Sequence, residues 1–211
     1  MAARPRQVSD EEILDIASAC FLEHGAGVST QVIAERLGIS QAALFKRFNT
    51  KEELLLRALL PPERNELMHW LDAGPGGGAL KPQLATLFGL LWQMVSYIVP
   101  RITVLNASGV GQSAMMRRYK KFPLFSAIAS LAGWIHRAQE QHRLAVCGHP
   151  MDLAQAWLGT MQGRALTRFV LADIIPKEQI ASGYTAVGDD DTYIATVTDL
   201  VWRAVGIDEG E

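Results

Sequence analysis

Net charge and cysteine are both scarce in this chain. Its 20 basic side chains nearly balance 22 acidic ones, which leaves a formal net charge of −2. A general polyanion binder carries a large positive field, so any affinity for nucleic acid must come from a local basic patch. The two cysteines, Cys20 and Cys147, lie far apart with no C-x-x-C pair. This spacing fits a reduced cytoplasmic protein without a disulfide framework.

Catalytic motifs are also missing. The sequence contains no G-x-S-x-G and no H-E-x-x-H, and Cys20 has no plausible base near it in the sequence. No metal-ligand spacing connects the five histidines, which are His24, His69, His136, His142 and His149. We therefore predict that the protein is not an enzyme and holds no metal and no cofactor. An all-helical enzyme, with a metal site built from scattered His and Asp, is the disfavoured alternative.

Neither a secretion signal nor a membrane span is expected. The first residues, MAARPRQVSDEE, include no apolar core of the kind that a signal peptide requires. The longest apolar stretch, residues 84–99, is interrupted by Gln93 and Ser96 and is too short to cross a bilayer. We expect a soluble, cytoplasmic protein with no membrane partner.

The remaining patterns are helical. The composition, 49% hydrophobic and 20% charged, is typical of a globular protein. Ser9-x-x-Glu12 and Thr50-x-x-Glu53 are capping boxes, which predict the starts of two helices. Helices are expected at about residues 9–24, 29–37, 40–48, 81–99, 100–105, 113–119, 124–143, 150–172 and 190–205, and no convincing strand run or internal repeat is present.

Two segments rich in proline or glycine interrupt these patterns. The helix that begins after Thr50 should continue towards Trp70 through Pro61-Pro62 or be kinked there. The run at 73–78, AGPGGG, is the most obvious boundary in the chain.

Residues 29–57, STQVIAERLGISQAALFKRFNTKEELLLR, are the most informative part of the sequence. A first helix could bury Val32, Ile33 and Leu37 on one face. After a turn that contains glycine, Ser40 can cap a second short helix whose apolar face is Leu44 and Phe48. This is the layout of a helix-turn-helix, which offers its second helix to the major groove of DNA.

The stretch from Ile13 to Leu56 resembles the N-terminal domain of the TetR family of one-component transcriptional repressors. The match closes in F-x-x-K-E-E-L, which makes it more specific than a helix-turn-helix pattern alone. The matching residues are Ile13, Ala17, Phe21, Gly25, Ser29, Ile33, Ala34, Gly38, Ile39, Ser40, Leu44, Phe45, Phe48, Lys51, Glu52, Glu53 and Leu54.

This resemblance implies an all-α fold. An N-terminal three-helix helix-turn-helix DNA-binding domain, residues 1–57, is joined to a C-terminal helical effector-binding and dimerisation bundle, residues 58–211. The implied function is a sequence-specific repressor, released from a palindromic double-stranded DNA operator by a small apolar or amphipathic effector. In a two-fold dimer the two reading helices lie about 34 Å apart, one DNA turn. Activation, or a dimeric interaction protein that has lost operator specificity, stays an alternative.

The exposed face of the second helix should read DNA. Gln41 can pair with adenine, and Ala42 or Ala43 can touch a thymine methyl group. The predicted DNA-binding residues are Arg4, Arg6, Gln31, Ser40, Gln41, Ala42, Ala43, Phe45, Lys46, Arg47 and Lys51. Phe45 departs from the family pattern, since many members have a phosphate-binding tyrosine there, and Ala42 replaces a frequent glycine. Arg36 and Arg57 are interpreted as solvated helix faces.

The C-terminal half is rich in aromatic residues and methionine, which line apolar ligand pockets between helices but also fill ordinary cores. The predicted effector-binding residues are Trp92, Gln93, Tyr97, Phe125, Trp134, Met161 and Arg164.

The two last long helices should form the dimer interface. A stripe of small residues allows close helix approach, and an apolar face on the last helix complements it. The stripe is Ala156, Gly159, Thr160 and Gly163, and the apolar face is Ile194, Val197, Val201 and Trp202. The basic cluster at 117–121 is interpreted as a solvated face, with a phosphate-bearing ligand as the alternative.

Overall fold

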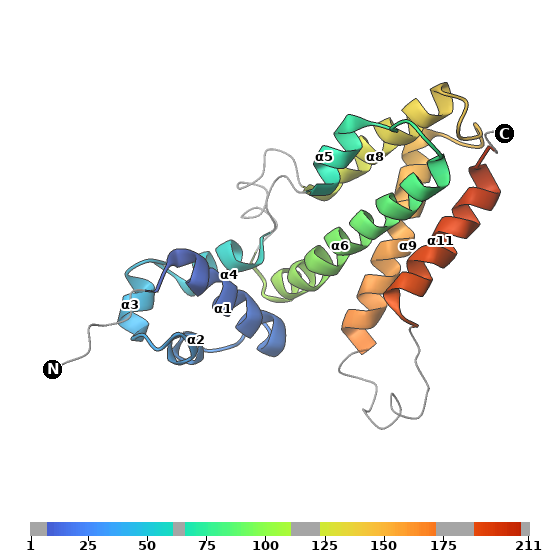
Figure 1. Cartoon of the computed structure of the whole chain (residues 1–211). Coiled ribbons are helices and arrows are strands. Elements are labelled where there is room, and N and C mark those ends of the chain that lie inside the picture. The colour runs from blue at the N-terminus through green and yellow to red at the C-terminus, as the bar shows by residue number, and fades with distance from the viewer. Residues whose placement is uncertain (1–7, 61–65, 111–122, 172–187, 208–211) are drawn as a thin grey trace. The chain divides into compact units, whose positions relative to one another are not determined.

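The computed structural model describes residues 8–60, 66–110, 123–171 and 188–207, and these ranges are helical without a strand (Figure 1). A single antiparallel bridge joins Leu144 to Gly206. The helices are α1 Asp10–His24, α2 Thr30–Leu37, α3 Gln41–Phe45, α4 Lys51–Leu59, α5 Glu66–Ala73, α6 Leu80–Ala107, α8 Pro123–Glu140, α9 Pro150–Leu171 and α11 Asp190–Val205. The predicted all-α class is confirmed.

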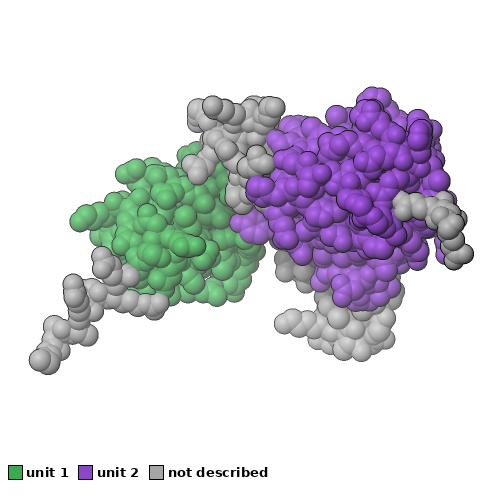
Figure 2. Space-filling model, turned by 45° about the horizontal axis from the view of Figure 1, so that its top comes forward, with its two compact units in different colours: residues 1–61, 100–118 green, residues 62–99, 119–211 purple. Residues whose placement is uncertain are grey.

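The chain forms two compact units (Figure 2). Unit 1 contains residues 1–61 and 100–118, and unit 2 contains residues 62–99 and 119–211. The predicted division at residue 57 separates two functions and stays a prediction. Grouped by spatial contact, the first boundary between the units lies after residue 61, and the end of α6 belongs to unit 1.

Unit 1 is organised around α1, which packs against α2 and α4. Its core is apolar and fully buried because the helices turn one stripe of side chains inward. The predicted caps are present: Ser9 Oγ accepts from the backbone N–H of Glu12 at 3.1 Å, and Thr50 Oγ1 accepts from that of Glu53 at 3.0 Å. The core includes Ile13, Ala17, Phe21, Ile33, Leu44, Phe48 and Leu54.

The helix that begins after Thr50 is shorter than expected. α4 ends at Leu59, and Leu60 is extended, with φ −73° and ψ 127°. The residue before a proline is driven out of the helical region by the proline ring, which explains the stop before Pro61. Trp70 belongs to the separate helix α5, so a continuous helix through the two prolines was wrong.

At Pro100 the helix continues, in contrast to the stop before Pro61. We expected separate helices at 81–99 and 100–105, but α6 runs unbroken from Leu80 to Ala107 with Pro100 inside it. A proline removes one intrahelical hydrogen bond. Buried side chains on both sides of it, Ile98, Val104 and Leu105, hold the helix in place.

α6 also bears on the membrane question. At 28 residues it is long and apolar enough to cross a bilayer by length and composition, contrary to the expectation from residues 84–99. Of its most apolar window, 44% is buried inside the protein.

In unit 2, α8 packs against α9 and α5. Aromatic pairs mark its core: Trp70 stacks on Trp134 with ring centroids 5.4 Å apart, and Phe88 lies 5.7 Å from Trp157. The glycine-rich run does not separate the two units, since it joins α5 to α6 within unit 2. Its backbone is held by the side chain of Gln83, which bonds to Gly76 in both directions at 2.9 and 3.1 Å, and by Arg143.

Candidate DNA-reading surface

The turn between α2 and α3 is tight because of Gly38. This residue has a φ of 68°, in the left-handed region that favours glycine. Its N–H donates to the carbonyl of Glu35 at 3.0 Å, and the N–H of Ile39 donates to that of Ala34 at 3.0 Å. This pair of bonds is the Schellman motif. Ser40 follows at once as the cap of α3, its Oγ accepting from the N–H of Ala43 at 3.1 Å. The two helices are therefore fixed relative to each other by local bonds.

α3 divides into a buried and an exposed face. Leu44 and Phe48 are fully buried, as predicted. α3 itself ends at Phe45, three residues earlier than expected, although Lys46 and Phe48 still donate to the carbonyls of Ala42 and Leu44 at 3.0 and 3.1 Å. Phe45 is half-buried. The exposed side chains that follow the cap are Gln41, Ala42, Ala43, Lys46 and Arg47.

α2 leaves exposed one apolar residue that was expected to be buried. Val32, which was predicted to be buried beside Ile33, is 41% exposed. Gln31 is exposed, and its Nε2 donates to Oε1 of Glu35 at 2.9 Å, one helical turn further on. Gln31 therefore lies on the outer face of α2, as a DNA contact requires, but shares this face with an acid.

A hydrogen bond crosses from α3 to α2. Nε2 of Gln41 donates to Oγ1 of Thr30 at 2.6 Å. Thr30 is only 6% exposed, while Gln41 is exposed. Sequence reasoning missed this partner because the two residues lie 11 positions apart on different helices.

Arg47 is tied to the start of α1. Its Nη1 donates to the carbonyl of Val8 and lies 3.2 Å from Oδ1 of Asp10. Arg57 approaches the same carboxylate at 3.9 Å, and its guanidinium lies 4.6 Å from the centre of the Phe48 ring. Arg57 is thus partly engaged rather than simply solvated. Arg47 remains about a third exposed, so it holds α1 near α3 and keeps donors for a further partner.

Lys51 is the first residue of α4, directly after the cap Thr50, and is half-buried. It lines a hollow of about 500 Å³ in unit 1 together with Glu52 and Leu55. Arg4 and Arg6 lie outside the described residues, as does the basic cluster at 117–121.

The predicted effector residues of unit 2 are spread over its core and surface. Trp134 and Met161 are fully buried, Trp92 and Arg164 are half-buried, and Gln93, Tyr97 and Phe125 are exposed. Within the described ranges, Trp134 Nε1 and the buried Ser96 Oγ have no hydrogen-bond partner. Sequence reasoning missed Ser96 because nothing in a helical pattern tells a buried serine from an exposed one.

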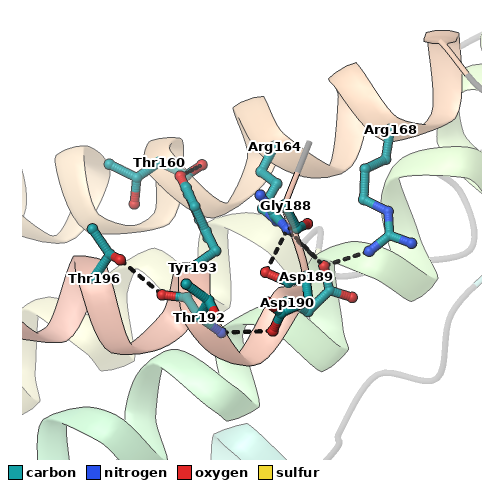
Figure 3. A network of polar contacts seen from close by, with 9 residues as sticks. All are labelled: Thr160, Arg164, Arg168, Gly188, Asp189, Asp190, Thr192, Tyr193 and Thr196. Atoms are coloured by element: carbon teal, nitrogen blue, oxygen red, sulfur yellow. Dashed lines mark hydrogen bonds and ion pairs between the residues drawn. The ribbon is translucent and has the colours of Figure 1, made fainter. Parts of the chain in front are cut away.

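Arg164 is the centre of a network that joins α9 to the start of α11 (Figure 3). Its Nη2 lies 3.0 Å from Oδ1 of Asp190 and donates to the carbonyl of Asp189 at 2.9 Å. Arg168 shares the same Asp190 oxygen. The Arg164 guanidinium also lies 4.3 Å from the Tyr193 ring centre and 5.6 Å from that of Trp92, so two predicted effector residues meet here. These contacts give Arg164 a structural role, and its role as a ligand contact stays a prediction.

The predicted dimer stripe is open in the isolated chain. Its members on α9 are exposed: Ala156, Gly159, Thr160 and Gly163. On α11 the most exposed large apolar residue is Leu200, at 61%. Val197, which was predicted to face a partner, is buried within its own unit, and Ile194, Val201 and Trp202 are half-buried. The exposed face of α11 therefore includes Leu200 and differs from the predicted apolar face, whose residues are buried or half-buried.

Comparison with known proteins agrees with this geometry. Residues 13–58 match the family model of bacterial regulatory proteins of the tetR family. No curated protein sequence matches the chain. Among solved structures, NalD, the secondary repressor of the MexAB-OprM multidrug efflux pump in Pseudomonas aeruginosa, is similar at 19% identity and a TM-score of 0.59 over 93% of this chain and 94% of that one.

Two further structures span nearly the whole chain. The MbdR regulator from Azoarcus sp. CIB has 16% identity and a TM-score of 0.65 over 90% of this chain and 95% of its own. A TetR family transcriptional regulator from Pseudomonas syringae pv. tomato str. DC3000 has 16% identity and a TM-score of 0.58 over 98% and 100%. At such identities these likenesses establish the fold.

The helix-turn-helix and its family match together define a DNA-binding transcriptional regulator rather than an enzyme. Residues 13–58 therefore form an N-terminal domain of the kind found in bacterial regulatory proteins of the tetR family.

Proposed function

We propose that the protein is a sequence-specific repressor that binds a palindromic operator as a homodimer in the cytoplasm. A small apolar or amphipathic effector releases it. The observation that carries the proposal is the exposed face of α3, which presents small and polar side chains. The helix is capped by Ser40 and follows a turn that the backbone hydrogen bonds of Gly38 and Ile39 hold in place. A reading helix must approach base edges closely, which the small side chains permit.

The residues divide by the kind of DNA contact they offer. Gln41 is the base reader, with Ala42 and Ala43 against thymine methyl groups. Lys46, Arg47 and Lys51 face phosphates, which fix register but carry no sequence information. Ser40 and Phe45 pack on the sugar-phosphate backbone, and Gln31 adds a polar contact from α2. Arg4 and Arg6 are proposed to reach an adjacent groove or the backbone.

Dimerisation is supported by the exposed small residues of α9 and by Leu200 on α11. Small side chains let two helices approach closely, and an exposed leucine gains from burial. A two-fold pair of chains places two copies of α3 on one side of a duplex, which requires a palindromic site.

Effector binding is supported by the interior of unit 2. The buried Trp134 indole N–H and Ser96 hydroxyl lack partners among the described residues, and a buried polar group normally has one. A polar group of a bound effector can satisfy a buried group of this kind, and Met161 and Trp92 are proposed to supply apolar contacts. The NalD structure is named as a repressor of a multidrug efflux pump, which supports repression as the direction of control.

The test is fluorescence-anisotropy binding of the full chain to the DNA upstream of its own gene, over a salt series. We expect binding with the stoichiometry of a dimer, tighter than to scrambled DNA, and weakened by Gln41→Ala and Lys46→Ala. Arg203→Ala, which removes an exposed charge from unit 2, is the control and should bind normally. Equal, weak binding to both DNAs contradicts sequence-specific regulation and favours an interaction protein that has lost operator specificity.

Release by an effector is tested on the same complex. A compound that binds the full chain must weaken operator binding by its differential affinity for the two states of the protein. A compound that binds tightly yet leaves operator affinity unchanged contradicts that part of the proposal.

A further inference from the structure

The hydrogen bond between Gln41 and Thr30 links the proposed base reader to a buried residue of the neighbouring helix. Gln41 is the first residue of α3 and Thr30 the first residue of α2. The donor Nε2 and the acceptor Oγ1 are 2.6 Å apart, and Thr30 is 6% exposed. The acceptor is therefore held in the protein interior while the amide extends to the surface.

This bond determines which hydrogen-bonding groups of the Gln41 amide are left to pair with a base. A glutamine side chain has two N–H donors and one carbonyl oxygen. Pairing with adenine uses one N–H, given to N7, and the oxygen, which accepts from N6. The bond to Thr30 occupies the other N–H and leaves the set that adenine needs.

Guanine needs a different set. In the major groove it presents two acceptors, N7 and O6. An amide with both N–H groups free can donate to both acceptors, whereas the amide held by Thr30 has one N–H left. The bond also limits rotation about the long side chain, which lowers the conformational entropy lost when DNA is bound.

We propose that Thr30 is a positioning residue that makes Gln41 select adenine over guanine at one position of each operator half-site. This inference rests on the proposed function, since it requires a DNA sequence to be read. Gln31 shows the contrast: its amide is bonded to the exposed carboxylate of Glu35 on its own helix, which does not orient it from the interior.

The variants follow from the shape of Thr30. Thr30→Val keeps the branched, buried side chain and removes the acceptor. Thr30→Ser keeps the acceptor and is the conservative rescue. Glu35→Ala is the matched control, because it breaks the other amide contact on α2 without touching Gln41.

The experiment uses the full chain and a library of random duplex DNA. Sequences enriched by the wild-type chain give the operator, and Gln41→Ala identifies the base pair that Gln41 reads. Affinity is then measured for adenine and guanine at that position by fluorescence anisotropy, with thermal melting to verify that each variant is folded.

We expect the wild-type chain, Thr30→Ser and Glu35→Ala to prefer adenine, and the preference to fall by about 5-fold or more in Thr30→Val. A folded Thr30→Val with unchanged preference overturns the inference. So does equal binding of adenine and guanine by the wild-type chain, an outcome that needs no variant. If the wild-type chain enriches no sequence, the proposed function itself fails, which is a distinguishable result.

Discussion

At the scale of single residues, intramolecular contacts decide which polar side chains of the candidate DNA-reading surface stay available to a partner. Arg47 forms an ion pair with Asp10, and Gln31 forms a hydrogen bond with Glu35. Lys46 is exposed and makes no ion pair within the part of the chain that the structure describes. Gln31 is uncharged, and a cation without an ion pair neutralises a phosphate without first giving up a partner, so Lys46 should contribute more to the salt dependence of binding than Arg47.

We predict that Lys46→Ala weakens binding to operator and scrambled DNA by a similar factor. The slope of log K against log salt should fall in magnitude by about one for each bound protomer, because one phosphate contact is lost. Anisotropy titrations at several salt concentrations measure both quantities. Arg203→Ala should leave the slope unchanged, and a Lys46→Ala slope equal to that of the wild-type chain would remove Lys46 from the interface.

At the scale of helices and turns, Gly38 and Gly27 form a natural comparison. A Cβ added at either residue meets no atom within 4 Å, so space does not distinguish them. Only Gly38 has a positive φ, 68°, which costs an L-residue roughly 1–2 kcal/mol.

We therefore predict that Gly38→Ala lowers the free energy of unfolding by about 1–2 kcal/mol. Gly27→Ala should change it little or raise it by roughly 0.4–1 kcal/mol, because alanine restricts the unfolded chain. Urea unfolding followed by circular dichroism measures the difference. Equal effects of the two substitutions would show that the left-handed turn is not what demands glycine.

The same scale shows what the sequence could predict. Helices with local signals were located well: the acidic residues Asp189, Asp190 and Asp191 suit a helix N-terminus, a helix was expected at 190–205, and α11 spans Asp190–Val205. Ends near prolines were located less well, because α4 ends before Pro61 whereas α6 continues through Pro100, where buried side chains lie on both sides of the proline. The contacts that shape the candidate sites were not predictable either. Gln41–Thr30, Arg47–Asp10 and Arg164–Asp190 join residues 11, 37 and 26 positions apart, and no local periodicity encodes such pairs.

Helix-to-helix pairing in unit 2 has a pH signature. Nζ of Lys81, on α6, lies 2.8 Å from Oδ1 of Asp199, on α11, and this hydrogen bond and the charge of Lys81 lower the pKa of Asp199. A carboxyl whose pKa is lower in the folded state stabilises the fold above its unfolded pKa. That stability is lost as the pH falls through the lowered value.

We predict that Asp199→Asn makes the free energy of unfolding less sensitive to acid below about pH 4. Near neutral pH, its dependence on pH should be unchanged. Lys81→Met should act in the same direction, since it removes the partner. Both groups are about half exposed, so the effect should be small. Chemical unfolding at pH 3 and pH 7 measures the effect. If both variants show the same difference in the free energy of unfolding between the two pH values as the wild-type chain, the Lys81–Asp199 pair does not contribute to the acid sensitivity.

At the scale of the whole molecule, the proposed repressor must be a dimer to read a palindrome. The exposed stripe on α9 contains two glycines, Gly159 and Gly163, with nothing within 4 Å of an added Cβ. In a lone chain, alanine at such helical positions is favoured over glycine by about 1 kcal/mol. In a dimer packed closely along this stripe, a larger side chain holds the two helices apart. Monomer stability and dimer affinity are therefore expected to respond in opposite directions.

We predict that Gly159→Leu raises or preserves helix content while shifting the chain from dimer to monomer. Sedimentation velocity over a concentration series measures the shift, and operator affinity should fall with it, because a monomer holds only one half-site. Gly159→Ala and Gly89→Ala, which each add only a Cβ into open space, give a matched pair on α9 and α6, and Gly89→Ala should stay dimeric. A Gly159→Leu chain that remains a dimer and binds the operator normally would place the subunit interface on another face.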